Sequence, residues 1–472
     1  MALPSTPCLP AVMATELYVF AHLLGEFVPA GILTLTETPL GVEASSFSYG
    51  TRYLQRSQAI EVDPVSLALA DKAQVREKSL VPVNGLPLFG GLRDAAPDAW
   101  GRRVIEAKFK VPANSLPEST YLLEAGSERV GALDVRRQLT DRASAGVSEV
   151  KALQYLLEAA ERIELGEPVP TRLTDLFGSS PGAGGARPKA SVRDSDGLLW
   201  LAKFASRGDT FDVATAEHAT LRLAEACGMT VPASKVVDLG GKHTLLIRRF
   251  DRYWIDDDAL RGGPAQLPAD LALHATLPTD TARHEWRLPF ASALTMVACD
   301  EMASRTKGYA DIAHAIRRQV HPSFIRQNNK ELFSRMVFNI LASNDDDHLR
   351  NHGFVWDPRA GGWRLSPLYD VVPRPAIAQE RFLHLEVGLQ GKLATLDNAM
   401  SKYAQFDLQR PEAIALMARV VTTVAGWRER FEAHGAPGRL MDQLARAFRV
   451  LDEVASPALR SELAAADDNP AH

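Results

Sequence analysis

An α+β architecture with more than one packed unit is predicted by the length of the chain and by a change of pattern along it. The chain has 472 residues, and single hydrophobic cores stop growing at roughly 250–300 residues, so two or three units are expected. Residues 15–137 read as mixed strands and turns, whereas helical periodicity dominates from Pro289 onward. The prediction is an N-terminal α/β subdomain followed by a mainly helical C-terminal lobe.

The composition is ordinary for a globular protein. Hydrophobic residues make up 46% and charged residues 24% of the chain, and no apolar run is long enough to predict a membrane span. The net charge of −5 argues against a strongly basic nucleic-acid binder. The three cysteines are far apart, and residues 1–13 lack the basic start of a signal peptide. These features predict a cytoplasmic protein without disulfides.

Five segments are predicted along the chain. Polar and small residues at 138–148 indicate a linker. Two strands are expected on either side of a turn at 194–197, followed by a helix over 212–227 and a strand over 244–247. The predicted segments are a disordered tail (1–14), the N-terminal subdomain (15–137), a β-rich N-lobe with a glycine-rich loop (138–265), a helical C-lobe (266–455) and a tail (456–472).

The strongest motif is the acidic run Asn344-Asp-Asp-Asp-His-Leu-Arg-Asn351, which follows a buried helix pattern at 331–343. Three adjacent carboxylates repel one another and lie near the negative end of the helix dipole, so a counter-charge is expected. Four residues separate Asp346 from Asn351. A catalytic aspartate and a metal-binding asparagine have this spacing in protein kinases. A solvated acidic loop is the alternative reading.

A second acidic residue is predicted to return to this loop. After Asn351 the pattern indicates a strand, a turn at 357–362 and a second strand, and this hairpin leads to Asp370. Asp370 can then bind a metal ion as the aspartate of the DFG motif does in protein kinases. The sequence predicts a magnesium site at Asn351 and Asp370.

Residues 178–189 form a glycine-rich segment that ends in Lys189. Glycines such as Gly182, Gly184 and Gly185 allow backbone N–H groups to approach phosphate oxygens closely. Pro188 precedes the lysine, so the segment does not match a Walker A loop. A flexible linker is the alternative reading.

Two further strands carry residues that suit a nucleotide site. Lys203 ends a strand and shares its face with Leu199 and Leu201, so its ammonium group needs a partner such as ATP phosphates. Glu217 on the next helix can pair with it, as a helix glutamate does in protein kinases. The strand that ends in Arg248 and Phe250 suits a hinge that binds adenine through its backbone.

Together these segments resemble the HipA family of toxin kinases. The resemblance is carried by Gly-Ala-Arg-Pro-Lys-Ala at 185–190, Arg-Arg-Phe-Asp-Arg at 248–252, the acidic run at 344–351 and Leu-Ser-Pro-Leu-Tyr-Asp at 365–370. Residues 89–102, Phe-Gly-Gly-Leu-Arg-Asp-Ala-Ala-Pro-Asp-Ala-Trp-Gly-Arg, also look like this family. The resemblance covers roughly residues 16–420 in consistent order.

The resemblance implies a two-lobed protein-kinase-like fold, related to phosphoinositide kinases. It implies transfer of phosphate from ATP, with Mg²⁺, to a protein serine or threonine, typically on an aminoacyl-tRNA synthetase. It also implies a HipB-like helix-turn-helix antitoxin as partner, with DNA contacted only through that antitoxin and no membrane. The implied roles are catalytic base for Asp346, magnesium ligands for Asn351 and Asp370, phosphate binding for Lys203, and hinge for Arg248 to Phe250.

The family also phosphorylates its own glycine-rich loop, usually at a serine seven residues before the lysine that corresponds to Lys189. Gly182 occupies that position here, so Ser179 and Ser180 are the candidates for autophosphorylation. Three other functions stay open: a kinase of a small-molecule or lipid hydroxyl, a non-toxic regulatory homologue, and a non-catalytic co-repressor. A hydrolytic two-metal centre at the acidic run is a fourth alternative.

Overall fold

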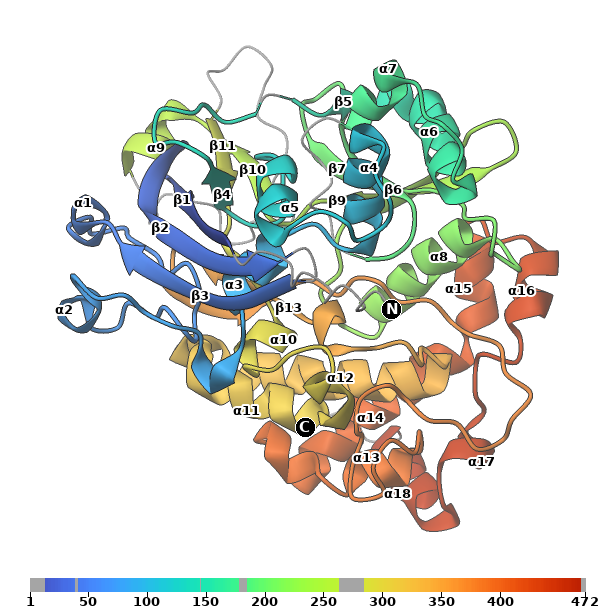
Figure 1. Cartoon of the computed structure of the whole chain (residues 1–472). Coiled ribbons are helices and arrows are strands. Elements are labelled where there is room, and N and C mark those ends of the chain that lie inside the picture. Colours follow the sequence, from blue (N-terminus) through green and yellow to red (C-terminus); the bar gives the residue numbers. More distant parts are fainter. Residues whose placement is uncertain (1–12, 39–40, 145, 178–184, 263–283, 468–472) are drawn as a thin grey trace, which may run out of the picture.

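The computed structural model describes residues 13–38, 41–144, 146–177, 185–262 and 284–467. In Figure 1 the large sheets lie in the upper half of the molecule, and the yellow to red helices of the C-lobe fill the lower half. The predicted α+β class with two lobes and an added N-terminal subdomain is confirmed.

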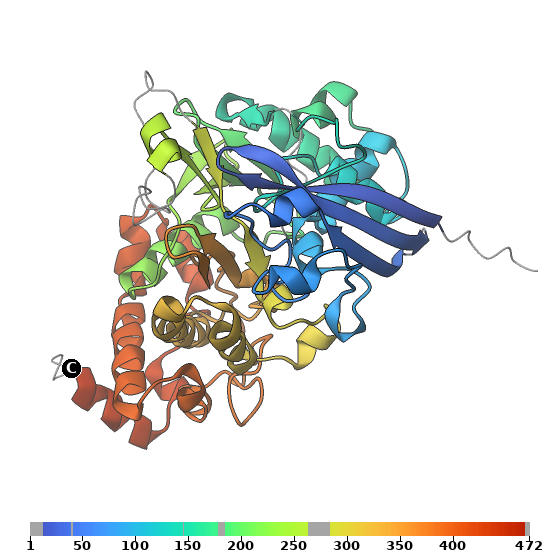
Figure 2. The same cartoon turned by 90° about the vertical axis from the view of Figure 1, so that its left-hand side faces the viewer.

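The N-terminal subdomain is built on an antiparallel sheet with the order β3-β2-β1-β4. Alternate residues Leu17, Val19, Leu33 and Leu35 are fully buried, as expected for strands with one face on a core. Figure 2 shows the blue strands of this sheet side by side. The elements are β1 (Met13–Leu23), β2 (Glu26–Thr38), β3 (Gly41–Tyr49), α1 (Thr51–Leu54), α2 (Lys72–Val75), η1 (Val83–Gly85), α3 (Gly90–Ala95), α4 (Ala99–Phe109), α5 (Glu118–Glu124) and β4 (Leu133–Arg136).

The N-lobe is a five-stranded sheet with the order β5-β6-β7-β9-β8. Its strands β6 and β7 pair antiparallel across the predicted turn at 194–197, which confirms that hairpin. Trp100 of the N-terminal subdomain belongs to the core beneath this sheet. The elements are β5 (Ser148–Glu149), η2 (Val150–Ala152), α6 (Leu153–Leu165), α7 (Thr171–Thr174), η3 (Asp175–Phe177), β6 (Lys189–Arg193), β7 (Leu199–Lys203), α8 (Val213–Ala226), β8 (Ser234–Asp238) and β9 (His243–Arg248).

The C-lobe is organised around α12, whose apolar side chains are almost completely buried. The predicted hairpin after Asn351 is confirmed as β13 and β14. The elements are α10 (Ala293–Met296), η5 (Ala303–Thr306), α11 (Tyr309–Gln319), η6 (Pro322–Phe324), α12 (Ile325–Ala342), η7 (Leu349–Asn351), β13 (Gly353–Asp357), β14 (Gly362–Leu365), α13 (Leu396–Met400), η8 (Tyr403–Phe406), α14 (Arg410–Ala425), α15 (Trp427–Ala433), α16 (Gly438–Leu444), α17 (Leu451–Val454) and α18 (Pro457–Asp467).

Two predicted segment limits differ from the structure. A tail from residue 456 is wrong over most of its length, because α18 packs on α14 and buries Leu459 and Leu463 in the C-lobe core. The limit at 265 separates two paired strands, β10 (Arg252–Ile255) and β11 (His284–Arg287). The short helix α9 (Asp257–Gly262) follows β10, and β12 (Phe290–Ser292) pairs with β13. Strand pairing therefore continues beyond the predicted start of the helical lobe.

The motif at 89–102 attaches the N-terminal subdomain to the C-lobe. The buried carboxylate of Asp94 accepts hydrogen bonds from the Ser292 backbone N–H at 2.6 Å, and from the hydroxyls of Ser292 and Thr295 at 2.7 Å each. A Cβ at Gly90 would lie 2.6 Å from the Thr295 Oγ1, and a Cβ at Gly91 would lie 2.1 Å from a backbone carbonyl. Gly90 is therefore needed for the close contact with the C-lobe, whereas Gly91 is needed for close packing on Val62 within the subdomain.

A buried ionic network attaches the same subdomain to the segment after β9. Arg249 and Arg252 donate to the backbone carbonyls of Glu128, Arg129 and Gly131 at 2.7–3.0 Å. Asp251 pairs with both arginines and accepts the Gly131 N–H at 2.8 Å. Buried charges need partners, and the docked position of the subdomain supplies partners for all three.

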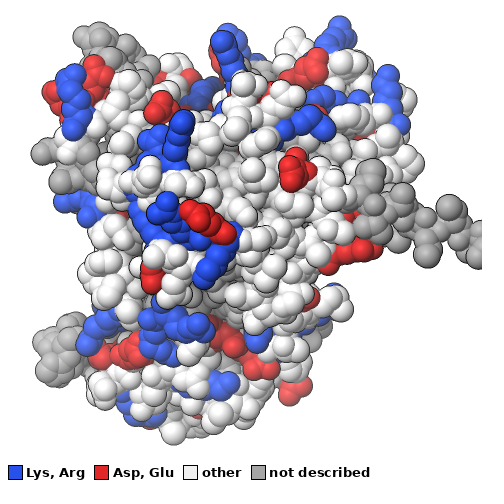
Figure 3. Space-filling view, turned by 60° about the vertical axis from the view of Figure 1, so that its left-hand side comes forward, with Lys and Arg blue, Asp and Glu red and all other residues white. Residues whose placement is uncertain are grey.

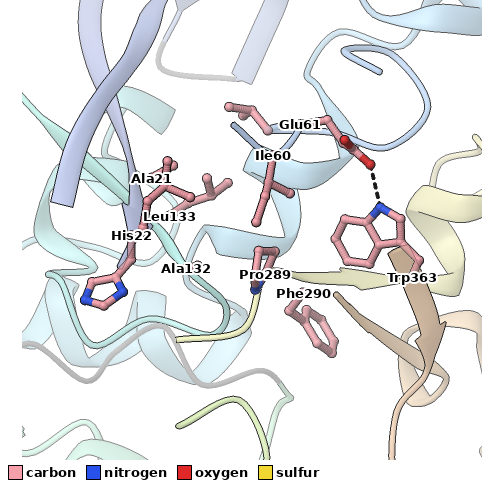
Figure 4. A pocket seen from close by; sticks show the side chains of 11 residues that line it. Ala21, His22, Ile60, Glu61, Ala132, Leu133, Pro289, Phe290 and Trp363 are labelled. Atoms are coloured by element: carbon pink, nitrogen blue, oxygen red, sulfur yellow. Dashed lines mark hydrogen bonds between the residues drawn. The ribbon is translucent and has the colours of Figure 1, made fainter. Parts of the chain in front are cut away.

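His22 lies beside a small cavity of about 10 Å³ at the interface between the subdomain and the C-lobe. Figure 4 shows the cavity, with Glu61 accepting a hydrogen bond from the Trp363 indole at 2.6 Å. Burial lowers the pKa of His22 from 6.5 to about 3, and the positive charges of Arg287 and Arg252 act in the same direction. The folded protein therefore holds this imidazole neutral.

The depressed pKa of His22 predicts an acid-sensitive fold. As the pH falls, the unfolded chain takes up the proton before the folded protein does. The contribution of the neutral His22 to the unfolding free energy is therefore complete above about pH 6.5 and is lost as the pH falls toward about 3. Between about pH 7 and about pH 5, His22→Phe should lose less unfolding free energy than the wild type, by about 2 kcal/mol. Urea denaturation at both pH values measures this difference. Equal losses in the two proteins would contradict the prediction.

Candidate active site

A cleft of about 630 Å³ lies where the N-lobe, the C-lobe and the N-terminal subdomain meet. All predicted site residues that the structure describes line it, except Lys189, Glu217 and Asp346. The lining includes Gly185 and Asn351 and the charged or aromatic residues Asp94, Asp98, Arg102, Lys203, Arg248, Phe250, His348, Arg350, Tyr369 and Asp370. Ser179, Ser180, Gly182 and Gly184 lie outside the described residues.

Lys203 joins the two lobes at the inner end of this cleft. Its Nζ donates to Glu217 Oε1 on α8 at 2.6 Å and to Asp370 Oδ1 at 2.7 Å. Burial disfavours the charged form, but Asp370 and Glu217 outweigh it and raise the pKa of the Lys203 ammonium group. Burial raises the pKa of the Glu217 carboxyl, and the positive charge of Lys203 acts in the opposite direction. The lysine is held as a cation at the point where the lobes converge.

A second lysine lies directly opposite Lys203 in the sheet. Lys189 and Lys203 are partners in the antiparallel register of β6 and β7, and both side chains are buried. Like charges at opposed positions are destabilising. Burial lowers the pKa of Lys189, while Asp98, 3.4 Å away, and Asp370 oppose that shift. Two buried ammonium groups on one face provide the field that an oligophosphate requires.

Gly185, near the end of the glycine-rich segment, lies against the Lys189 side chain. Its φ of +111° is unfavourable for other residues, and a Cβ there would lie 2.3 Å from the Lys189 Nζ. The Trp100 indole donates to the Lys189 carbonyl at 2.9 Å. The base of the predicted phosphate loop is therefore held by α4 of the N-terminal subdomain.

Asp370 has a backbone conformation that is rare for residues other than glycine, with a φ of +60°. Lys203 holds the pKa of its carboxyl well below the usual range, against the effect of burial. The preceding Tyr369 donates its hydroxyl to the Arg350 carbonyl at 2.7 Å and stacks on Phe250. A strained residue with a perturbed pKa in a cleft is typical of a functional site.

Asn351 lies on the same cleft and is oriented by the loop that carries Asp346. Its Nδ2 donates to the Asp346 carbonyl at 3.0 Å. Within the described part of the chain, no hydrogen bond is made by its Oδ1, which leaves that oxygen available as a ligand. The amide oxygen of Asn351 and the carboxylate of Asp370 line the same cleft, and both are oxygen donors that Mg²⁺ accepts. No group of three or more histidine, cysteine or acidic side chains converges on a metal position among the described residues.

The counter-charge expected for the acidic run comes from two directions. Arg374 Nη2 lies 2.7 Å from Asp346 Oδ2, and Arg374 Nε lies 3.4 Å from Asp345 Oδ1. Asp347 points the other way and is 1% exposed. It accepts hydrogen bonds from the Tyr309 hydroxyl at 2.5 Å and contacts His352 Nε2 at 2.9 Å. The alternative reading, a solvated acidic loop, therefore does not hold for Asp347.

Three of these site residues were not predicted from the sequence. Asp98 begins α4 by accepting the Gly101 N–H at 2.9 Å, and the pair Pro97-Asp98 is a helix-start signal that sequence analysis can detect. Asp347 lacks the four-residue gap to Asn351 on which the prediction rests, and no local pattern indicates that its carboxylate is buried. Arg374 has no recognisable motif around it.

A two-lobed fold with a lysine–glutamate pair between the lobes, and with an Asp and an Asn on one cleft, has the architecture of the protein-kinase class. The sequence profile of the HipA-like C-terminal domain family matches residues 182–427, which is more than half of the chain. The chain therefore belongs to the HipA family.

The chain is also similar to several known proteins. A curated Haemophilus influenzae protein named putative kinase is 27% identical over 177 residues, covering 36% of this chain and 44% of that protein. The Shewanella oneidensis HipA structure, solved with HipB and operator DNA, covers 95% of this chain and 96% of that chain, with a TM-score of 0.62 and 14% identity. The match to the Helicobacter pylori proinflammatory kinase CtkA covers 60% of this chain and 93% of that chain, with a TM-score of 0.37 and 12% identity.

Lys203→Met should weaken nucleotide binding and also destabilise the fold. Removing the lysine leaves Glu217, 2% exposed, without its cation, and breaking a buried pair costs about 3–5 kcal/mol. Titration calorimetry with a non-hydrolysable ATP analogue and urea denaturation measure the two effects. Lys235→Met, on the neighbouring strand β8 and outside the cleft, is the matched control. Unchanged nucleotide affinity in Lys203→Met would contradict the phosphate-binding role.

Proposed function

We propose that this chain is an ATP-dependent protein kinase that transfers the γ-phosphoryl group of ATP to a serine or threonine hydroxyl. The observation that carries the proposal is the convergence of Lys203, Glu217, Asn351 and Asp370 at one cleft between the lobes. These residues come from four separate segments of the sequence, namely β7, α8, η7 and the segment after β14. The convergence of a lysine, its glutamate and two metal-binding side chains is what phosphoryl transfer requires.

In the proposed mechanism, Lys203 and Lys189 bind the phosphates, and Gly185 allows the backbone to approach them. Arg248 and Phe250 line the part of the cleft next to β9, where adenine would bind. Mg²⁺, held by Asn351 and Asp370, would neutralise charge on the phosphates. Asp346 accepts the proton of the acceptor hydroxyl as the new O–P bond forms and the bond to the ADP leaving group breaks.

A protein acceptor is favoured over a small molecule by the position of Asp346. Its side chain is 53% exposed and lies outside the enclosed lining of the cleft. A base at the surface can be reached by a side chain of a large partner. An aminoacyl-tRNA synthetase in the cytoplasm is the substrate that membership of the family suggests.

We also propose a HipB-like antitoxin as partner, supported by the likeness to the S. oneidensis HipA that was solved with HipB and operator DNA. In Figure 3 basic side chains gather left of centre, with acidic side chains among them. This mixed face and the net charge of −5 favour contact with DNA through the antitoxin. No helix in the described ranges is both long and apolar enough to cross a bilayer.

Incubation with γ-³²P-ATP, Mg²⁺ and a cell lysate tests the proposal. Label in protein bands, absent with Asp346→Asn, is the expected result. Label confined to small molecules or lipids would instead favour the alternative kinase. Mass spectrometry of residues 178–191 in the same sample tests autophosphorylation at Ser179 or Ser180, and an active enzyme that never modifies this segment would contradict it.

A further inference from the structure

A short strap connects the proposed metal ligand to the proposed base. The strap runs from Asp370 to Arg374, and Val371 and Pro373 are buried within it. The backbone N–H of Arg374 donates to the Ser343 carbonyl at 3.2 Å, where α12 ends and the acidic loop begins. The position of Arg374 is therefore set at one side by the strap from Asp370 and at the other by the end of α12 at Ser343.

The guanidinium of Arg374 holds only one oxygen of the Asp346 carboxylate. Its Nη2 contacts Oδ2 at 2.7 Å, and its Nε reaches Asp345 at 3.4 Å. For the residues that the structure describes, no hydrogen bond to Asp346 Oδ1 is present. The fork of the guanidinium thus bridges two adjacent carboxylates and leaves one oxygen open, a geometry that lysine cannot reproduce.

These contacts contribute little to folding. The side chains of Arg374, Asp345 and Asp346 are 52%, 48% and 53% exposed. Ion pairs with this exposure typically contribute about 0–1 kcal/mol to stability. An effect of Arg374 on the reaction can therefore be measured in a variant that remains folded.

We propose that Arg374 is the positioning residue for the base, and this inference rests on the proposed phosphoryl transfer. By holding Oδ2, Arg374 directs Oδ1 of Asp346 toward the acceptor hydroxyl. The proton moves from the hydroxyl to Oδ1, the hydroxyl oxygen forms a bond to the γ-phosphorus, and the bond between that phosphorus and the ADP oxygen breaks. Arg374 contacts the base and not the reacting atoms.

The variants Arg374→Gln and Arg374→Lys test this role. Transfer of ³²P from γ-³²P-ATP to dephosphorylated casein and to the chain itself should fall about 10-fold to 100-fold in Arg374→Gln, because misplacing a reacting group by about 1 Å has effects of this size. Arg374→Lys should recover part of the rate. Affinity for the non-hydrolysable ATP analogue should stay within about two-fold, since only orientation of the base has changed.

Arg381→Gln is the matched control. Arg381 lies seven residues beyond the strap and donates to the Ser343 hydroxyl at 2.5 Å, but it does not contact Asp346. An equal loss of transfer in Arg381→Gln would show that segment placement, and not the base contact, is responsible. Transfer in Arg374→Gln at or above the wild-type rate would overturn the proposal. A wild-type protein without any transfer would instead refute the proposed function, and this inference would fall with it.

Discussion

Asp346→Asn should lower the rate of phosphoryl transfer by on the order of 100-fold or more, because the acceptor hydroxyl loses the group that takes its proton. The fold should be little affected, since the only side-chain partner of Asp346 among the described residues is the exposed Arg374. Quench-flow or filter-binding measurement of ³²P transfer, together with a thermal melt, separates the two effects.

Asp345→Asn is the control for this change. It alters the adjacent carboxylate, which is also half exposed and also faces Arg374. Its rate should fall by less than about ten-fold, because the spacing to Asn351 excludes it from the role of base. Comparable losses in both variants would indicate a general charge effect and would contradict the assignment of Asp346.

Asp370→Asn should remove most of the magnesium-dependent turnover of ATP. The amide keeps the shape of the carboxylate and tolerates the φ of +60°, but it is a much weaker ligand for Mg²⁺. Loss of several kcal/mol of charge stabilisation corresponds to about 100-fold or more in rate. Lys203 keeps its contact with Glu217 at 2.6 Å, so the fold should persist. A magnesium titration of turnover measures the effect.

Asp357→Asn is the control for Asp370→Asn and is expected to lower stability without changing the magnesium dependence of turnover. Asp357 ends β13, is buried, and accepts the Arg359 N–H at 2.9 Å in the turn of the hairpin. Its substitution should lower the free energy of unfolding by about 1–2 kcal/mol and leave the magnesium dependence unchanged. If Asp370→Asn instead lowered stability and kept magnesium-dependent turnover, Asp370 would be a structural residue.

Local patterns of the sequence were sufficient for the elements that carry the site. The apolar periodicity of α12, the turn between β6 and β7, and the hairpin at 353–365 are all set by neighbouring residues. The pairing of Lys203 with Glu217 could also be anticipated, because strand alternation and helix phase each place one charge on a buried face.

Other features depend on contacts between distant residues and could not be predicted in this way. Asp98 reaches Lys189 from another subdomain, and Arg374 reaches Asp346 through an irregular strap. The helix α18 buries few large side chains, chiefly Leu459 and Leu463, so its sequence alone resembles a polar tail, and α14 provides the surface on which it packs. Such contacts are fixed by the tertiary fold, which outweighs weak local preferences.

The most direct test of the account is a crystal structure with a non-hydrolysable ATP analogue and Mn²⁺ in place of Mg²⁺. The account predicts an anomalous manganese peak within bonding distance of Asn351 and Asp370, with the phosphates between that ion and Lys203. A nucleotide bound in the part of the cleft near Arg102, or a manganese peak away from both ligands, would contradict the central claim that this cleft is a kinase active site.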